Sequence, residues 1–261
     1  MFSPSGSLLQ LDYAHTAALE KSLPILSFVV ANSNPNSNSK STPSVIFATL
    51  TKSKRLRQKQ ISPPGFYMID KSIAALGSGL IHDANEVASI ARGARLDFKK
   101  TYGNEYESKG SSIHYIAQAC SKRFQKLSLQ LQRPYGCALV LGGVISSVPE
   151  LYVINPSGGI ICRKHVAFGI NSESIRKKLK MKFNDGDCGE GCDSLEEGIK
   201  LAAALLHEAK ESMGAKGGDE LGDSGSQYDI EIKFVNEEGT FVVEGEEIER
   251  LVSESRAESR R

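Results

Sequence analysis

The spacing of the apolar residues alternates along this chain between the short runs of β-strands and the three-to-four-residue repeat of amphipathic helices. This alternation restricts the possible folds more than any other feature. The strand-like runs lie in three blocks, at residues 25–30, 45–50, 66–69 and 72–76, then 137–141, 151–154, 159–162 and 166–168, and finally 229–235 and 240–243. Pairs of helical repeats separate the blocks, at residues 80–98 and 113–127 and at residues 175–183 and 195–213.

A fifth helical stripe precedes the first strand, at residues 8–20, and Ser5 or Ser7 is a candidate N-cap for it. We expect the first four strands to form one antiparallel sheet and the strands after Pro134 to form a second. Each one-sided helix must bury its apolar stripe, so the two sheets should stack with a helix layer outside each. The sequence therefore predicts an α+β fold, a four-layer αββα sandwich with an additional N-terminal helix.

The chain length of 261 residues suits a single domain, which we place at residues 1–255. Residues 1–21 hold the opening segment and first helix. Two polar stretches are expected to be loop insertions, the Asn-, Ser- and Pro-rich residues 32–43 and the glycine-rich residues 214–227. Ser253 onward should be a frayed tail, of which residues 256–261 form the charged end.

Composition excludes several functions. A formal net charge of +1 gives too weak a field to gather nucleic acid or an anionic membrane, and no apolar run approaches the roughly 20 residues of a membrane span. The five cysteines are an odd number in a chain too long to need disulfides, so we expect reduced thiols. Cys188 and Cys192 lack a second Cys or His pair, and the histidines are scattered, so no metal site is predicted.

The opening residues form a specific motif, Phe2-Ser3-Pro4-Ser5-Gly6-Ser7-Leu8-Leu9-Gln10-Leu11-Asp12-Tyr13-Ala14. It resembles the signature of proteasome alpha-type subunits, a Phe-Ser-Pro-x-Gly-x-Leu-x-Gln-hydrophobic-acidic-Tyr-Ala string. Later motifs agree with this resemblance in order and spacing, namely Ser78-Gly79-Leu80, Asp83-Ala84, Arg133-Pro134-Tyr135-Gly136 and Asn155-Pro156-Ser157-Gly158. The resemblance extends from Phe2 to about Ser255. Within it, Phe2-Ser3-Pro4-Ser5-Gly6 and Asn236-Glu237-Glu238-Gly239 are most similar to the second alpha type.

The resemblance implies the N-terminal nucleophile hydrolase fold without its catalysis. Catalytic relatives expose an N-terminal threonine assisted by an aspartate and a lysine. The position of that nucleophile corresponds to Ser22, which follows 21 residues, and the aspartate position falls near Leu50. We therefore expect no catalytic residue and no cofactor, in a chain that is a structural component of a threonine-type endopeptidase complex.

The resemblance also implies residues for gating and activator docking. Pro4 and Tyr13 match the family's turn proline and gate tyrosine, although Pro4 could simply start the helix and Tyr13 could simply pack. The family's Tyr-Asp-Arg tail is absent before Phe2, so little tail is expected for a gate. Gly79 and Leu80 match the floor of the activator pocket. The family's pocket also contains a lysine. Without a gap in the alignment its position falls on Gly65, and only a shift across Pro63-Pro64 brings Lys59 to it. Otherwise Lys59 is one solvated member of a basic run.

The partners implied are other alpha-type subunits in a seven-membered ring, the beta-type ring, and a regulatory particle or other activators. Cytoplasm and nucleus are the expected locations. The basic run at residues 52–59 could be a nuclear localisation signal, a nucleic-acid patch or a solvated loop, and the near-neutral total charge favours the solvated loop. Two alternatives stay open. The chain could be an active N-terminal nucleophile hydrolase, or a proteasome-like protein that works alone as a binding module.

Overall fold

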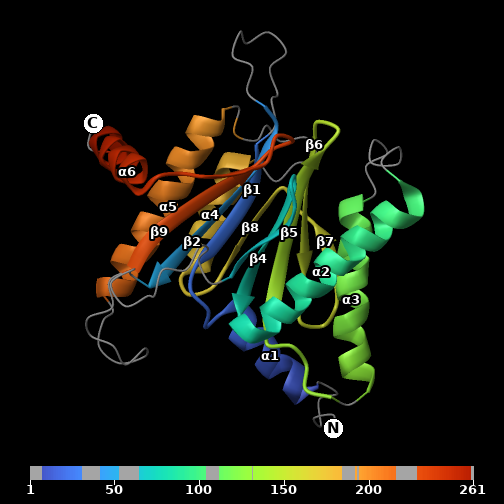
Figure 1. Ribbon diagram of the computed structural model, residues 1–261. Helices are drawn as coiled ribbons and strands as arrows, with labels where there is room; N and C mark the ends of the chain where they lie inside the picture. The colour runs from blue at the N-terminus through green and yellow to red at the C-terminus, as the bar shows by residue number, and fades with distance from the viewer. Residues whose placement is uncertain are drawn as a thin grey trace.

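The structure is a computed structural model that describes residues 8–30, 42–52, 65–103, 112–130, 132–183, 192, 194–215 and 228–259 (Figure 1). The helices are α1 Leu9–Leu19, α2 Ile81–Tyr102, α3 Ser112–Leu129, α4 Ser172–Phe183, α5 Leu195–Ala215 and α6 Gly245–Ser259. The strands are β1 Ile25–Val30, β2 Ser44–Lys52, β3 Phe66–Asp70, β4 Ile73–Gly79, β5 Cys137–Ile145, β6 Val148–Ile154, β7 Ile160–Cys162, β8 His165–Phe168, β9 Tyr228–Val235 and β10 Thr240–Val242.

The strands form two antiparallel sheets, in the orders β10-β9-β2-β1-β8 and β3-β4-β5-β6-β7. The predicted grouping of the first four strands into one sheet is wrong, because β1 and β2 belong to the first sheet and β3 and β4 to the second. The free edge of β2 pairs with β9, from Val45 opposite Val235 to Lys52 opposite Tyr228, so β3 cannot pair there. An apolar run shows that a strand is buried, but not which edge it joins.

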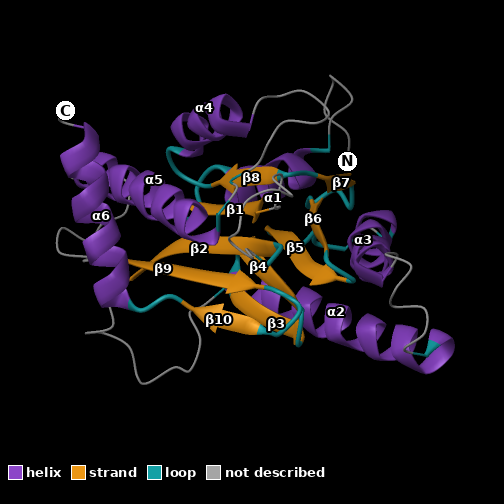
Figure 2. Ribbon diagram, turned by 90° about the horizontal axis from the view of Figure 1, so that it is seen from above, coloured by secondary structure: helices purple, strands orange, loops and turns teal. Residues whose placement is uncertain are grey.

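The sheets stack face to face, with α4, α5 and α6 outside one and α2 and α3 outside the other (Figure 2). Alternation along the strands produces these layers. In β2, Val45 and Phe47 point between the sheets, whereas Ile46 and Ala48 face the helices of the first sheet. The predicted four-layer αββα sandwich, with a helix before its first strand, is confirmed.

Two details of the termini differ from expectation. The N-cap of α1 is Leu8, which makes no side-chain capping hydrogen bond, and the predicted caps Ser5 and Ser7 lie outside the described residues. Helix α6 extends to Ser259, into the stretch predicted to be frayed. It is held by a short apolar stripe of Ile248, Leu251 and Val252 that packs in the same core as α5. This stripe is brief and surrounded by charged residues, which is why it gave no clear periodic signal.

Within the described ranges, no helix combines the length and apolar content needed to cross a bilayer. The same ranges contain no group of three or more His, Cys, Asp or Glu side chains arranged around a possible metal ion. Cys188 lies outside the described residues, whereas the side chain of Cys192 is buried in the core beneath α4 and α5.

Candidate functional site

Helix α1 lies across the end of the sandwich at which β4 ends and β5 begins (Figure 1). Ala14 and Ala18 are its buried residues, and small side chains at these positions allow the helix backbone to come close to the sheet. The closest approach is at Gly79, the last residue of β4. A Cβ there would lie 2.9 Å from the Cα of Ala18 and 2.3 Å from the carbonyl oxygen of Gly136. Gly79 also has φ of +96°, a conformation that favours glycine. Both the close packing and the backbone conformation therefore require a glycine at this position.

Two serine hydroxyls meet the last turn of α1. Ser78 Oγ donates to the carbonyl oxygen of Ala18 at 2.6 Å, Ser22 Oγ lies 3.0 Å from the same oxygen, and the two hydroxyls are 2.7 Å apart. The carbonyls of a final helical turn have no partner within the helix, so these serines satisfy one of them. Ser22, for which the sequence predicts the nucleophile position of catalytic relatives, thus helps to hold α1 in place and is linked through the backbone to that helix.

Leu80 follows Gly79 and is the N-cap of α2. Its amide donates to the carbonyl oxygen of Gly136 at 2.9 Å, which joins the start of α2 to the segment before β5. The Leu80 side chain is 49% exposed, and the neighbouring Ile81 is 47% exposed. The β4–α2 junction therefore presents the apolar side chains of Leu80 and Ile81 to solvent, next to the closely packed Gly79.

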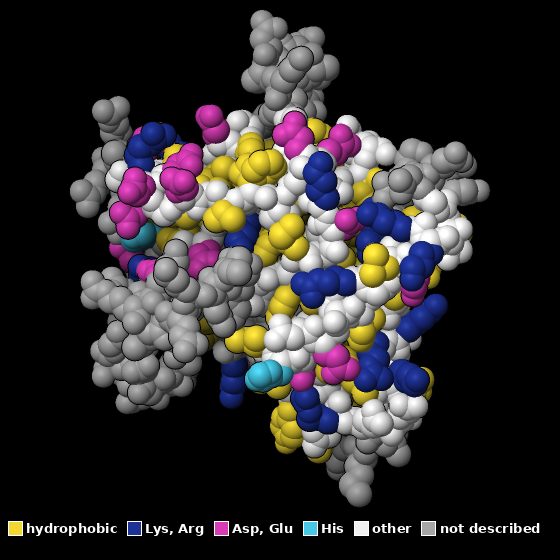
Figure 3. Space-filling view, in the orientation of Figure 1, with side chains coloured by type: hydrophobic (Ala, Val, Ile, Leu, Met, Phe, Trp, Pro, Cys, Tyr) yellow, Lys and Arg dark blue, Asp and Glu magenta, His cyan; other side chains and the backbone are white. Residues whose placement is uncertain are grey.

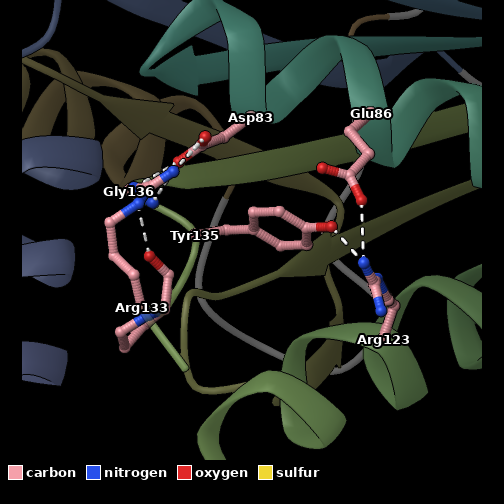
Figure 4. A network of polar contacts seen from close by, with 7 residues as sticks. Asp83, Glu86, Arg123, Arg133, Tyr135 and Gly136 are labelled. Atoms are coloured by element: carbon pink, nitrogen blue, oxygen red, sulfur yellow. Dashed lines mark hydrogen bonds and ion pairs between the residues drawn. The ribbon is translucent and has the colours of Figure 1, made fainter. Parts of the chain in front are cut away.

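Asp83 locks this junction to the segment before β5 (Figure 4). It accepts hydrogen bonds from both terminal nitrogens of Arg133, at 2.6 and 2.9 Å, and from the amide of Gly136 at 2.8 Å. Burial alone would raise the pKa of Asp83, but these donors outweigh it, so the pKa is lowered and the carboxylate stays charged. A bidentate pair of this kind fixes direction as well as distance.

A second contact lies one turn further along α2 (Figure 4). Arg123 of α3 donates to Glu86 at 2.9 Å and to the hydroxyl of Tyr135 at 3.1 Å. Burial, followed by the hydrogen bond with Glu86, raises the pKa of Tyr135 to about 12, so its hydroxyl stays protonated. The Tyr135 ring packs edge to face against Phe124 with centroids 5.1 Å apart. These contacts therefore hold together helix α2, helix α3 and the Arg133–Gly136 segment.

The structure brings together Gly79, Leu80 and α1, whereas it does not describe Pro4 or Lys59. Tyr13 lies on α1 with 64% of its surface exposed, so it is not a core residue of the isolated chain. Asp83 and Arg133 stand in two of the sequence motifs, but the motifs alone predict no contact between them. Their ion pair joins positions 50 residues apart, which a local pattern cannot show. The available signal was the opposite charge of the two residues, each next to a glycine-containing motif.

These features define a class: an αββα sandwich of the N-terminal nucleophile hydrolase type in which a helix precedes the first strand and lies against β4 and β5. A family model described as "Proteasome subunit" matches residues 40–220, and the chain belongs to this family. It is similar to the proteasome subunit alpha of Pyrococcus horikoshii, with 29% identity over 219 residues that cover 83% of this chain and 74% of that protein.

Similar relatives come from distant organisms. The proteasome subunit alpha of Methanocaldococcus jannaschii is 26% identical over 82% of this chain and 73% of its own length. The proteasome subunit alpha type-7-B of Arabidopsis thaliana is 28% identical over 99% of this chain and 90% of its own length. The predicted alpha-type resemblance is confirmed, while the particular similarity to the second alpha type stays a prediction.

Proposed function

We propose that this chain is a non-catalytic structural subunit of the outer alpha ring of a 20S proteasome core. Its tasks there are assembly of the seven-membered ring with other alpha-type subunits, contact with the beta-type ring, substrate gating and docking of a regulatory particle or other activator, in ubiquitin-dependent protein degradation. Cytoplasm and nucleus are its proposed locations.

The observation that supports this role most directly is the seating of α1. An N-terminal nucleophile hydrolase needs a free amine and an accessible hydroxyl at the start of β1. Here the chain passes through α1 before it reaches Ser22, and Ala18 and Ser78 lie within hydrogen-bond distance of the Ser22 hydroxyl. We place the family's aspartate position near Leu50, which is only 1% exposed within the core beneath the helices.

Gly79 and Leu80 are proposed to form the floor of the activator pocket. The observation that supports this proposal is the partly apolar β4–α2 junction, which the ion pair of Asp83 and Arg133 holds in place. Tyr13 is proposed to contact a neighbouring chain at the gate, since its ring is available on the outer side of α1. Pro4 and Lys59 keep their proposed roles on the resemblance alone.

Native purification tests the proposal. The chain carries an affinity tag at its C-terminus and is isolated from its own cells, and the product is measured by native mass spectrometry. We expect a particle that contains other alpha-type and beta-type subunits, in both cytoplasmic and nuclear fractions. Recovery of the chain alone as a monomer would support the stand-alone binding protein, and a mature terminus at Ser22 would support the hydrolase.

A further inference from the structure

Lys233 is a charged side chain in an unusual place. It lies on β9 with only 6% of its surface exposed. Its neighbour Ile232 packs in the core beneath the helices, so Lys233 points the other way, between the two sheets. There its Nζ lies 4.2 Å from the centroid of the Phe66 ring on β3 of the opposite sheet. The Lys233 side chain therefore crosses from one sheet to the other.

No carboxylate in the described part of the chain pairs with this ammonium. Glu231, two residues back on the same face of β9, accepts a hydrogen bond from Thr51 at 3.1 Å. Burial lowers the pKa of Lys233, and the charge of Glu231 offsets this only in part. A cation over an aromatic ring is stabilised, but an unpaired buried charge is still costly, and a carboxylate would pair with it favourably.

Exposed apolar side chains lie beside the buried Lys233. Strands β10 and β3 are the end strands of their sheets, and they are neighbours in the projection of Figure 2. Val242 pairs in register with Lys233 and is 63% exposed, and Met68 on β3 is 53% exposed. Figure 3 looks onto this face and shows hydrophobic side chains gathered at its centre, with charged side chains on both flanks. We call Phe66, Met68, Lys233 and Val242 the sheet-mouth site.

We propose that the sheet-mouth site binds a carboxylate side chain, flanked by apolar residues, from a neighbouring alpha-type subunit. The carboxylate pairs with Lys233, and the flanking residues cover Met68 and Val242. Charge complementarity favours this occupant, because no salt bridge joins the buried ammonium to a carboxylate among the residues that the structure describes. The end strands also offer backbone groups to an incoming segment. This inference rests on the proposed role as a ring subunit and identifies one of the surfaces that would make the ring.

Zero-length cross-linking of the purified particle tests the contact. A carbodiimide condenses a lysine amine with a nearby carboxylate into an amide, and the reagent takes up the water. We expect Lys233 to be joined to an aspartate or glutamate of another subunit. The intrachain pair of Lys182 and Glu197, 2.5 Å apart, is the positive control. A cross-link at the control without any from Lys233 to another subunit would overturn the proposal.

Matched variants provide the second test, as tagged chains that compete with the untagged chain for incorporation. Lys233→Met should reduce incorporation at least about tenfold, because a buried charge pair is lost, whereas the control Lys182→Met should not. The free Lys233→Met chain should be as stable as the original, since an apolar side chain of similar length replaces an unpaired charge. Equal incorporation of Lys233→Met and wild type would refute the inference.

A surface variant keeps the test valid if Lys233→Met fails to fold. Val242→Asp places a like charge beside the incoming carboxylate and should also reduce incorporation about tenfold. Met181→Asp, at a residue that is 81% exposed on α4, is its control. Equal incorporation of these two variants would count against the site. Recovery of the wild-type chain with no other subunit at all is a different result, since it would reject the ring role itself.

Discussion

Gly79 lies so close to Ala18 that a single added Cβ at Gly79 would come within 2.9 Å of the Ala18 Cα. This contact joins the end of β4 to the last turn of α1, and the hydrogen bond from Ser78 to the Ala18 carbonyl lies beside it. The seating of α1 and the shape of the β4–α2 junction therefore depend on each other. A change at Gly79 should disturb both.

We predict that Gly79→Ala destabilises the fold by about 2–4 kcal/mol, because alanine is strained at positive φ and its Cβ would clash with backbone atoms. The control is Gly93→Ala on α2, where a Cβ would meet no atom within 4 Å. Gly93→Ala should stabilise by about 0.5–1 kcal/mol. Urea unfolding measures both variants, and limited proteolysis should cut α1 sooner in Gly79→Ala. Similar stability of the two variants would contradict the close packing of α1.

The carboxylate of Asp70 predicts a pH dependence of stability. It lies 2.6 Å from Arg95 Nε and 2.8 Å from Lys99 Nζ. Burial alone would raise its pKa, but these donors outweigh burial and lower the pKa to about 2. The pKa in the unfolded chain is about 4. The charged carboxylate therefore stabilises the fold above about pH 4, and this contribution is lost as the pH falls from about 4 through 2.

We expect Asp70→Asn to lower the free energy of unfolding by about 2 kcal/mol at pH 7. The difference between variant and wild type should shrink steadily when urea unfolding is repeated from pH 4 down to pH 2.5. The control is Glu173→Gln, in an exposed pair of α4 with side chains 79% and 69% exposed, which should leave the stability nearly unchanged at every pH. A difference for Asp70→Asn that stays constant with pH would show that its charge is not the cause.

The turn between β5 and β6 places two serines in a backbone conformation that suits glycine or asparagine better. Ser146 and Ser147 have φ of 49° and 62°, in the left-handed region that a two-residue hairpin turn requires. Asparagine followed by glycine suits this geometry, so the double substitution Ser146→Asn and Ser147→Gly should stabilise by about 0.5–1 kcal/mol. The amide of residue 147, which donates to Glu237, is retained. A higher urea midpoint at unchanged slope is the expected result, and a lower midpoint would show that the serine side chains themselves contribute.

Much of this fold follows from local patterns. Short apolar runs located β1 and β2, because both faces of these strands are buried, and the helical stripes located α2 and α5, because these helices bury one side. The grouping of strands into sheets could not be read in this way. The partner of β2 is β9, about 180 residues later in the chain, and only the packed structure shows that choice.

In the candidate site, too, local motifs could be predicted from the sequence but contacts between distant segments could not. The resemblance pointed to Gly79 and Leu80 through a short motif. The reasons for these residues are contacts between distant segments: Ala18 against Gly79, and Arg133 around Asp83. Lys233 gave no periodic or motif signal, because a single lysine in an apolar strand is read as a solvent-facing position. Its burial depends on the opposite sheet, which places Phe66 beneath it.

Ser22 separates the proposed role from the hydrolase alternative. If the chain is a structural subunit, Ser22→Ala should leave peptide hydrolysis by the purified particle unchanged. It should cost only about 1 kcal/mol of stability, because Ser78 still donates to the Ala18 carbonyl. Ser78→Ala removes the shorter, more deeply buried hydrogen bond and should cost more, about 1–2 kcal/mol. Fluorogenic peptide assays and urea unfolding of both variants test this order. Loss of the chain's own hydrolysis in Ser22→Ala, with Ser78→Ala still active, would identify Ser22 as a nucleophile and reject the structural role.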